Sequence, residues 1–533
     1  RACWLERKWQ MNSRYRMHQI KLNMNETKSD IPKKILKRLN NRDLILTDLK
    51  IIKESLDARD KKDIKLVYTV DFQAVTRQRP KQYASLPLNP KLGLEEAPDM
   101  SYIDVESGGE EMIDQPVIVG FGPCGMFAGL ILAKRGYRPI IIERGSQIEK
   151  RVKDVECFWN EGILNPESNV QFGEGGAGTF SDGKLTTGIK DPRIRKVLEE
   201  FVRAGADEDI LYKQKPHIGT DVLRTVVKNI REEIIRCGGE VRFDTRFAEV
   251  NTKKKCVKSV VAECEGQRYE IPTQNVILAV GHSARDTFRY LCERGIKMQQ
   301  KPFSVGVRIE HSQELIDKSQ YGDTKGLPPA DYKLNYHCEN GRGVYTFCMC
   351  PGGEVIVASS QEGGVVTNGM SNRARNSGKA NSGLLVDVRC EDFGSPHPLA
   401  GIEFQEKYEK LAFENGGSNY QPPKTTWGEF RSETLAAAPV IRSLPDFAVE
   451  AIREAMPNLG RKLSGFDRDD ALMTAVETRS SSPVRFARNE QMEGTFGGFY
   501  PAGEGTGYAG GIMSAACDGI KVAEKIISKY KPF

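Results

Sequence analysis

Three glycine-rich segments of this chain have residue types and spacings from which chemistry can be inferred. The first, residues 117–125, reads VIVGFGPCG. Its Gly120, Gly122 and Gly125 form the pattern G-x-G-x-x-G. In that pattern the first glycine permits a tight turn, the second lets the backbone approach a pyrophosphate, and the third allows close packing of a helix on a strand. We therefore predict a dinucleotide-binding turn here.

The elements expected around this turn support the prediction. An apolar strand at Val117–Val119 precedes the glycines, and an apolar helix running to Arg135 follows them. Pro139–Ile142 is expected to be a second strand, which completes a βαβ unit. Glu143 follows that strand, where a carboxylate can accept hydrogen bonds from ribose hydroxyls. A glycine-rich turn without a ligand is the alternative.

The second segment, residues 173–184, reads GEGGAGTFSDGK and has four glycines within six residues. Glycines leave the backbone N–H groups unshielded, so this segment is expected to lie beside a ligand. Asp182 and Lys184 add charge to it. The alternative interpretation is a flexible surface loop.

The third segment, residues 499–511, again predicts a strand followed by glycines and then a helix, here over 511–530. Glu504 stands between Gly503 and Gly505, where its carboxylate can hold a polyol hydroxyl. The helix start can point at a phosphate or a ring carbonyl. The alternative is a helix start packed in a core.

Two arginines are candidate substrate anchors. Arg308 shares one face of the strand expected at Phe303–Ile309 with Glu310, so it could clamp an acidic substrate or form a surface ion pair. Arg479 lies in a hydroxyl-rich stretch that could bind an anion or be a polar loop. With Lys184, these two arginines are our speculative catalytic residues.

The twelve cysteines are scattered without disulfide-scaffold or zinc spacing, which fits a reducing compartment. Cys348 and Cys350 share one face of an expected strand. They could be redox thiols, form a strained disulfide or bind a soft metal. The favoured interpretation is that they are two small buried residues before a turn, and we predict no metal site. The chain has neither a Cys-x-x-Cys pair nor a second G-x-G-x-x-G, which argues against a disulfide reductase and a dedicated NAD(P) domain.

Together, the three segments resemble the FAD-binding flavoproteins of the glutathione-reductase-like superfamily. The chain is most similar to a family of FAD-dependent dehydrogenase-like proteins of mostly unassigned reaction, through residues 176–184 (GAGTFSDGK) and 348–353 (CMCPGG). The resemblance extends from about residue 20 to the end. One departure from the superfamily is Glu, not Asp, at position 504.

The resemblance implies that FAD is the cofactor, with NADH or NADPH as a possible transient electron donor. It implies that the backbone around Phe247 meets the adenine and that the turn at Gly281 lies near the cofactor. The predicted cofactor-binding residues are Gly120, Gly122, Pro123, Cys124, Gly125, Glu143, Arg144, Gly175, Gly176, Gly178, Thr179, Lys184, Phe247, Gly281, Gly503, Glu504, Gly510, Gly511 and Ile512.

The predicted fold class is α/β: a Rossmann-like FAD-binding domain of three layers (ββα), an inserted mixed α+β substrate domain and a small N-terminal α+β domain. In the N-terminal domain we expect helices at Ile31–Asn40 and Asp48–Ala58 and a strand at Ile64–Val70. The predicted boundaries are an extension at 1–17, the N-terminal domain at 18–90, a linker at 91–111, FAD-binding parts at 112–300 and 491–533, and a cap domain at 301–490.

Composition narrows the function classes. The chain has 533 residues, a net charge of +6 and no apolar run approaching the roughly 18 residues of a membrane helix. The first 100 residues hold 22 Lys and Arg against 13 Asp and Glu, which is only weak evidence for nucleic-acid binding. Residues 1–16 are Arg-rich and acid-poor; they are compatible with a transit peptide, but an extension before a natural start at Met11, Met17 or Met24 is favoured.

We therefore predict a cytoplasmic FAD-dependent oxidoreductase that transfers hydride at the flavin N5 of FAD to or from a small-molecule substrate. The substrate and the oligomeric state stay open. One alternative is a flavin-dependent RNA-modifying enzyme that uses the basic N-terminal domain. The other is a non-enzymatic FAD-binding protein whose N-terminal domain binds a protein partner.

Overall fold

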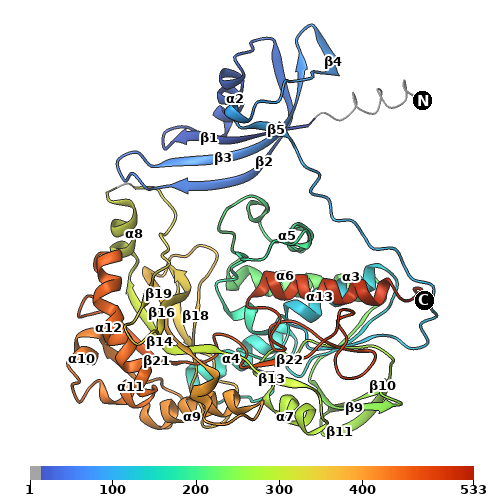
Figure 1. Ribbon diagram of the computed structural model, residues 1–533, viewed down its shortest axis with the longest axis vertical. Helices are drawn as coiled ribbons and strands as arrows, with labels where there is room; N and C mark the ends of the chain where they lie inside the picture. Colours follow the sequence, from blue (N-terminus) through green and yellow to red (C-terminus); the bar gives the residue numbers. More distant parts are fainter. Residues whose placement is uncertain (1–13, 324) are drawn as a thin grey trace. The chain divides into compact units, whose positions relative to one another are not determined.

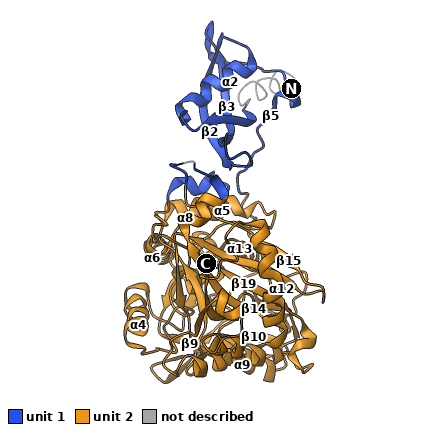
Figure 2. Ribbon diagram, turned by 90° about the vertical axis from the view of Figure 1, so that its left-hand side faces the viewer, with its two compact units in different colours: residues 1–102, 207–216, 320–327 blue, residues 103–206, 217–319, 328–533 orange. Residues whose placement is uncertain are grey.

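The computed structural model describes residues 14–323 and 325–533, which form two compact units (Figure 1). The first unit contains the chain up to residue 102 together with 207–216 and 320–327. The second unit contains the remaining residues; Figure 2 colours the two differently. None of the helices in the described ranges has both the length and the hydropathy that crossing a membrane requires.

The N-terminal unit is built on an antiparallel sheet with strand order β2-β3-β1-β5, and β4 pairs with β3. Helix α2 (Ile31–Leu39) contributes Ile31 and Ile35 to a buried cluster with Met17 and Phe72 of the sheet, so its apolar face covers the sheet. The strands are β1 (Tyr15–Asn23), β2 (Leu44–Asp57), β3 (Lys65–Thr76), β4 (Arg79–Tyr83) and β5 (Leu94–Glu96).

Within this unit the expected helix at Ile31–Asn40 and the expected strand at Ile64–Val70 are found, but the helix expected at Asp48–Ala58 is wrong. Residues 48–57 of that segment belong to the long strand β2. Its pairing with β3 shifts register between Thr47 and Lys50 and again between Ile51 and Lys53. Each irregularity interrupts the alternation of buried and exposed residues, so the apolar spacing imitates that of a helix.

The predicted boundaries of this unit are also corrected. Residues 15–17, predicted as part of an extension, begin strand β1 and pair with β5 at Leu94–Glu96. The segment predicted as a linker at 91–111 therefore supplies an edge strand, and the unit continues to Tyr102. Residues 1–13 of the predicted extension lie outside the described residues.

The second unit contains a parallel sheet with strand order β23-β12-β6-β7-β8. Alternate residues of its strands face two different layers. Val117 and Val119 belong to a buried cluster with Val260 of the antiparallel sheet β9–β11, whereas Ile118 and Ile141 approach Gly129 of α3. The strands are β6 (Val117–Val119), β7 (Ile140–Ile142), β8 (Glu240–Arg242), β9 (Thr245–Lys253), β10 (Cys256–Cys264), β11 (Gln267–Pro272), β12 (Val276–Leu278) and β23 (Phe499–Pro501).

A six-stranded antiparallel sheet of order β15-β16-β19-β14-β21-β20 follows in the same unit, with the pair β17–β18 beside it (Figure 1). A further two-stranded pair joins β13 (Met298–Gln300) to β22 (Val484–Phe486). The six strands and the extra pair are β14 (Phe303–Ser312), β15 (Asn335–His337), β16 (Gly343–Pro351), β17 (Glu354–Val357), β18 (Thr367–Met370), β19 (Lys379–Val388), β20 (Lys424–Thr426) and β21 (Leu472–Glu477).

The helices complete this architecture. α3 and α13 pack against each other so closely that a Cβ on Gly519 would lie 2.1 Å from the carbonyl oxygen of Cys124. The helices after α2 are α3 (Pro123–Lys134), α4 (Ile148–Glu161), α5 (Arg193–Arg203), α6 (Thr220–Arg236), α7 (Arg285–Glu293), α8 (Gln313–Tyr321), α9 (Ala400–Asn415), α10 (Trp427–Arg431), α11 (Ala438–Arg442), α12 (Asp446–Lys462) and α13 (Ile512–Ile527). The α/β class predicted from the sequence is thus confirmed.

Candidate functional site

The carboxyl ends of strands β6, β7, β12 and β23 open onto a pocket of about 450 Å³, as ligand sites of open parallel sheets do. All three glycine-rich segments contribute to its wall, and so does the six-stranded sheet. The predicted residues found in the wall are Gly120, Gly122, Pro123, Cys124, Glu143, Arg144, Gly176, Gly178, Lys184, Phe247, Gly281, Arg479, Glu504, Gly510, Gly511 and Ile512.

The glycines of the first segment have the geometry expected of a G-x-G-x-x-G turn. Gly120 has a φ of +101°, and a Cβ there would lie 2.5 Å from the carbonyl oxygen of Ala279. A Cβ on Gly125 would lie 2.0 Å from the carbonyl oxygen of Gly120, so Gly125 packs helix on strand and is not itself in the pocket wall. Gly122 precedes α3 and faces the pocket.

Glu143 is buried at the pocket wall and organises the turns around it. Its carboxylate accepts hydrogen bonds from the backbone N–H groups of Phe121 (2.8 Å), Gly145 (3.0 Å) and Gly173 (2.8 Å). A carboxylate has about four acceptor positions, so roughly one remains for a ligand. Glu143 therefore joins the first glycine segment to the second, a role that the sequence reasoning did not foresee.

Arg144 lies in the pocket wall but already has partners. Its guanidinium forms ion pairs with Glu167 (2.9 Å) and Asp286 (3.0 Å), and it stacks 4.3 Å from the ring centroid of Phe172. These contacts fix the rim of the pocket.

The second glycine segment is an ordered part of the wall, and the alternative of a flexible surface loop is wrong. Phe180 and Asp182 are each 1% exposed. Gly176 lies against Gly122, where a Cβ on Gly176 would be 2.9 Å from the Gly122 Cα. Two residues predicted to touch the cofactor instead support the segment from behind: Gly175 donates to the carbonyl of Phe121, and the Thr179 hydroxyl donates to the carbonyl of Glu174.

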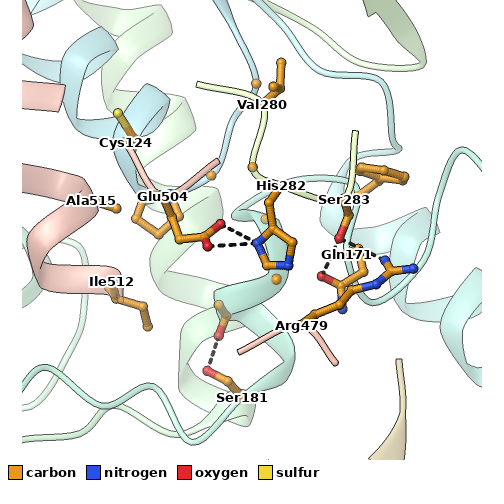
Figure 3. A pocket seen from close by; sticks show the side chains of 18 of the residues that line it. Cys124, Gln171, Ser181, Val280, His282, Ser283, Arg479, Glu504, Ile512 and Ala515 are labelled. Atoms are coloured by element: carbon orange, nitrogen blue, oxygen red, sulfur yellow. Dashed lines mark hydrogen bonds and ion pairs between the residues drawn. The ribbon is translucent and has the colours of Figure 1, made fainter. Parts of the chain in front are cut away.

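The third glycine segment brings Glu504 to the pocket (Figure 3). The Glu504 carboxylate pairs with the ring of His282 at 2.7 Å and accepts a hydrogen bond from the backbone N–H of Ser482. Gly503 is behind the wall, because its N–H donates to Asp518 and its Cα faces Cys124.

Lys184 lines the pocket, as do Cys348 and Glu477 of the six-stranded sheet. Its ammonium group is 3.6 Å from Asp182 but has no hydrogen-bond partner among the described residues. Burial raises the pKa of Glu477 to about 7, against the opposing effect of the Arg308 guanidinium. A carboxyl group with a pKa near neutrality can accept or donate a proton at physiological pH.

Arg308 is not in the pocket wall, and both sequence interpretations of it are wrong. Its side chain is completely buried behind Glu477, with which it pairs at 3.2 Å, and it also donates to Asn381. Glu310 pairs with Lys379 instead. Arg308 therefore supports the pocket wall through the residues in front of it.

Arg479 is in the wall, but its guanidinium is already engaged (Figure 3). It donates to both carboxylate oxygens of Glu409 and to the hydroxyls of Ser283 and Ser360. The structure thus favours a positioning role over the predicted anion-binding role.

Sequence reasoning missed three wall residues whose side chains could take part in a reaction: His282, Cys348 as a pocket residue, and Glu477. His282 follows the strand-to-turn sequence that also contains Gly281, so its position after a parallel strand was an available signal. Glu477 had no such signal, because only the pairing of β21 with β14 brings it to the pocket.

Comparison with known proteins defines the family. A Clostridium beijerinckii protein described as an uncharacterized protein is 47% identical over 535 residues, which cover 97% of this chain and 99% of that protein. This chain belongs to the same family. Residues 302–480 of this family member match the domain described as "FAD-dependent protein, C-terminal domain-like", and residues 14–73 match a domain of unknown function. The predicted relationship to FAD-dependent proteins is confirmed in this coarse form.

Solved structures with some likeness to this family member are flavoproteins and related enzymes. The flavin-dependent brominase Bmp2 gives a TM-score of 0.38 at 13% identity, covering 77% of each chain. Glycine oxidase from Bacillus cereus gives 0.33 at 12% identity, covering 78% of this chain and 94% of its own. Glycerol-3-phosphate dehydrogenase from Bacillus halodurans, in complex with FAD, gives 0.33 at 14% identity, covering 78% and 65%. These TM-scores are too low to define a shared fold.

Proposed function

We propose that this protein is a FAD-dependent oxidoreductase that acts on a small molecule. The observation that carries the proposal is one continuous pocket. Its wall contains the glycine turns after strands β6 and β12 and also Lys184, Cys348 and Glu477. The family match to an FAD-dependent domain over residues 302–480 supports the same conclusion.

The glycine-lined part of the pocket fits a dinucleotide. Helices α3 and α13 both begin at the wall, and within the described chain neither has a hydrogen bond from a capping side chain. Free N–H groups and the positive end of the helix dipole favour phosphates and ring carbonyls there. A Cβ on Gly281, Gly510 or Gly511 would meet no described atom within 4 Å, so these backbones are open to a ligand.

In this proposal the residues of the first segment hold the pyrophosphate, Glu143 holds the ribose through its remaining acceptor position, and Gly511 and Ile512 meet the ring system. FAD, when bound, supplies two-electron redox chemistry. Glu477 accepts or donates the substrate proton, as its pKa near 7 allows. The buried ammonium of Lys184 orients an anionic group of the substrate, because it has charge but no hydrogen-bond partner in the described chain.

The test is reconstitution of the purified full-length protein with FAD, followed by anaerobic reduction with NADH and with NADPH. We expect the visible absorbance of bound flavin and its loss on reduction, and reoxidation by candidate metabolites would then identify the substrate. A protein that stays colourless after reconstitution would refute the proposal. Salt-sensitive RNA binding would favour the RNA-modifying alternative, and a flavin that dithionite cannot reduce would favour the non-enzymatic one.

A further inference from the structure

Cys348 occupies an unusual backbone position at the pocket wall. It has a φ of +44°, which is uncommon for a residue other than glycine, and the pairing of β16 with β19 shifts register between Phe347 and Cys350. Such a bulge re-aims side chains along a strand. Here Cys348 is in the wall of the pocket, whereas Cys350 is completely buried and outside it.

Two cations face this pair of cysteines. Arg308 donates to the carbonyl oxygen of Cys348 at 3.0 Å and lies 3.7 Å from the Cys350 sulfur. The buried ammonium of Lys184 lacks a hydrogen-bond partner in the described ranges. Burial by itself would lower the pKa of Lys184, but the two cysteines, together with Asp182, outweigh burial and raise it. A thiolate in this position would therefore be stabilised by two positive charges in a medium of low dielectric constant.

The pKa of the Cys348 thiol is shifted in the opposite direction from that of several other cysteines. A hydrogen bond from the Cys350 side chain lowers the pKa of the Cys348 thiol well below its usual range, against burial, and Lys184 and Arg308 act in the same direction. Burial raises the pKa of Cys124, Cys338 and Cys517 instead. Among the described cysteines with a resolved shift, Cys348 is the one whose thiolate is favoured.

We propose that Cys348 and Cys350 form a thiol–disulfide exchange site for small-molecule disulfides that enter the pocket. The Cys348 thiolate attacks one sulfur of the substrate, the substrate S–S bond breaks, a mixed disulfide forms at Cys348, and the first thiolate product leaves and takes up a proton. Cys350 then attacks the Cys348 sulfur, the mixed disulfide breaks, and the second product leaves as a thiol with the proton that Cys350 gives up. The substrate gains two electrons, and the two cysteines lose them as they form one disulfide.

This inference deepens the proposed function and rests on it for one step only: the reduced cofactor would return the two electrons that restore the dithiol. The lack of a Cys-x-x-Cys pair argues against a disulfide reductase of the common arrangement. A Cys-x-Cys pair can take over that role here because both cysteines belong to one bulged strand. The Cα atoms of residues two apart on a strand are separated by no more than about 7 Å, which is the limit for a disulfide bridge.

The test uses the full-length reduced protein, with and without FAD, and 2-hydroxyethyl disulfide and iodoacetamide as probes. Mass spectrometry follows each cysteine over time at pH 6.5, where an ordinary thiol is only about 1% ionised. We expect Cys348 to react about tenfold faster than the exposed Cys256, or faster still. Equal or slower reaction at Cys348 would overturn the proposal.

Three variants sharpen this test. C350S should stop the reaction with 2-hydroxyethyl disulfide at the mixed disulfide, and K184M should slow the labelling of Cys348 and move its pH midpoint upward. C390S replaces a partly buried cysteine that does not line the pocket; it serves as the control and should change neither. A Cys348 adduct that never passes to Cys350 in the unmodified protein would overturn the assignment of the pair.

Bound FAD is measured by absorbance in the same samples, so the two proposals can fail separately. Fast labelling of Cys348 in a protein that binds no FAD would refute the proposed function but support the thiol site. Slow labelling in a protein that binds FAD would refute only the thiol site.

Discussion

The carboxylate of Glu504 and the ring of His282 form a partly buried pair in which Nδ1 lies 2.7 and 2.8 Å from the two carboxylate oxygens. The two residues follow different strands of the parallel sheet, β23 and β12, which lie side by side. Burial by itself would raise the pKa of the Glu504 carboxyl, but His282, the Ser482 N–H and Lys301 outweigh it, and the net shift is downward. The pair thus ties two of the pocket's turns together (Figure 3).

Replacing Glu504 by Gln should destabilise the protein in a pH-dependent manner. Because the folded-state pKa of Glu504 is lowered, its stabilising contribution is present above the ordinary value near 4.3 and is lost as the pH falls through the folded value. The free energy of unfolding should drop by about 1–3 kcal/mol at pH 7, and the difference from the unmodified protein should shrink below about pH 4. Urea denaturation across this range measures it, and E433Q, at an exposed position, is the control.

The opposite pH dependence is expected for Glu477. Its folded-state pKa is raised to about 7, so its contribution to stability is complete below the ordinary value and is lost as the pH rises through 7. The free energy of unfolding of the unmodified protein, relative to E477Q, should therefore fall between about pH 4.5 and 7.5 by at most about 3 kcal/mol. A difference that does not change with pH would mean that Arg308 keeps Glu477 ionised throughout.

Two glycines of the first segment should respond differently to alanine. A methyl group on Gly125 would lie 2.0 Å from the Gly120 carbonyl oxygen, so G125A should lower the free energy of unfolding by about 1–3 kcal/mol or more. Gly122 has a φ of −75°, and its nearest contact would be 3.8 Å away, so G122A should leave stability nearly unchanged. Because Gly122 faces the pocket, G122A should still weaken FAD binding, measured by fluorescence titration; tight binding by G122A would contradict the predicted turn.

The buried charges around Glu409 should matter more than those at the surface. Arg285 and Arg479 both donate to the Glu409 carboxylate, and all three side chains are at most 4% exposed. R479M would leave this cluster with one cation fewer and should cost about 3–5 kcal/mol in the free energy of unfolding. R289M, which removes the partly exposed ion pair with Glu406, should cost no more than about 1 kcal/mol. Equal effects in thermal or urea unfolding would contradict the structural account of Arg479.

Local sequence patterns were sufficient for the first glycine turn and the elements around it. The roles of Gly120 and Gly125 follow from steric contacts within one strand–turn–helix unit, so their spacing alone predicts them. The same holds for the helix at Ile31–Leu39, whose residues were correctly expected to be helical. Strand β2 was misread because its pairing irregularities depend on a partner strand and are not visible in its own residues.

The sequence by itself determined that a dinucleotide-type turn exists and that three glycine-rich segments belong to this chain. Only the tertiary structure decided what surrounds them. Strand pairing between segments far apart in the chain brought His282 to Glu504, buried Arg308 behind Glu477 and placed Cys348 and Lys184 in the wall of one pocket. Such contacts depend on which strands become neighbours and in which register they pair. A one-residue shift in register would move every side chain of a strand to the opposite face of the sheet.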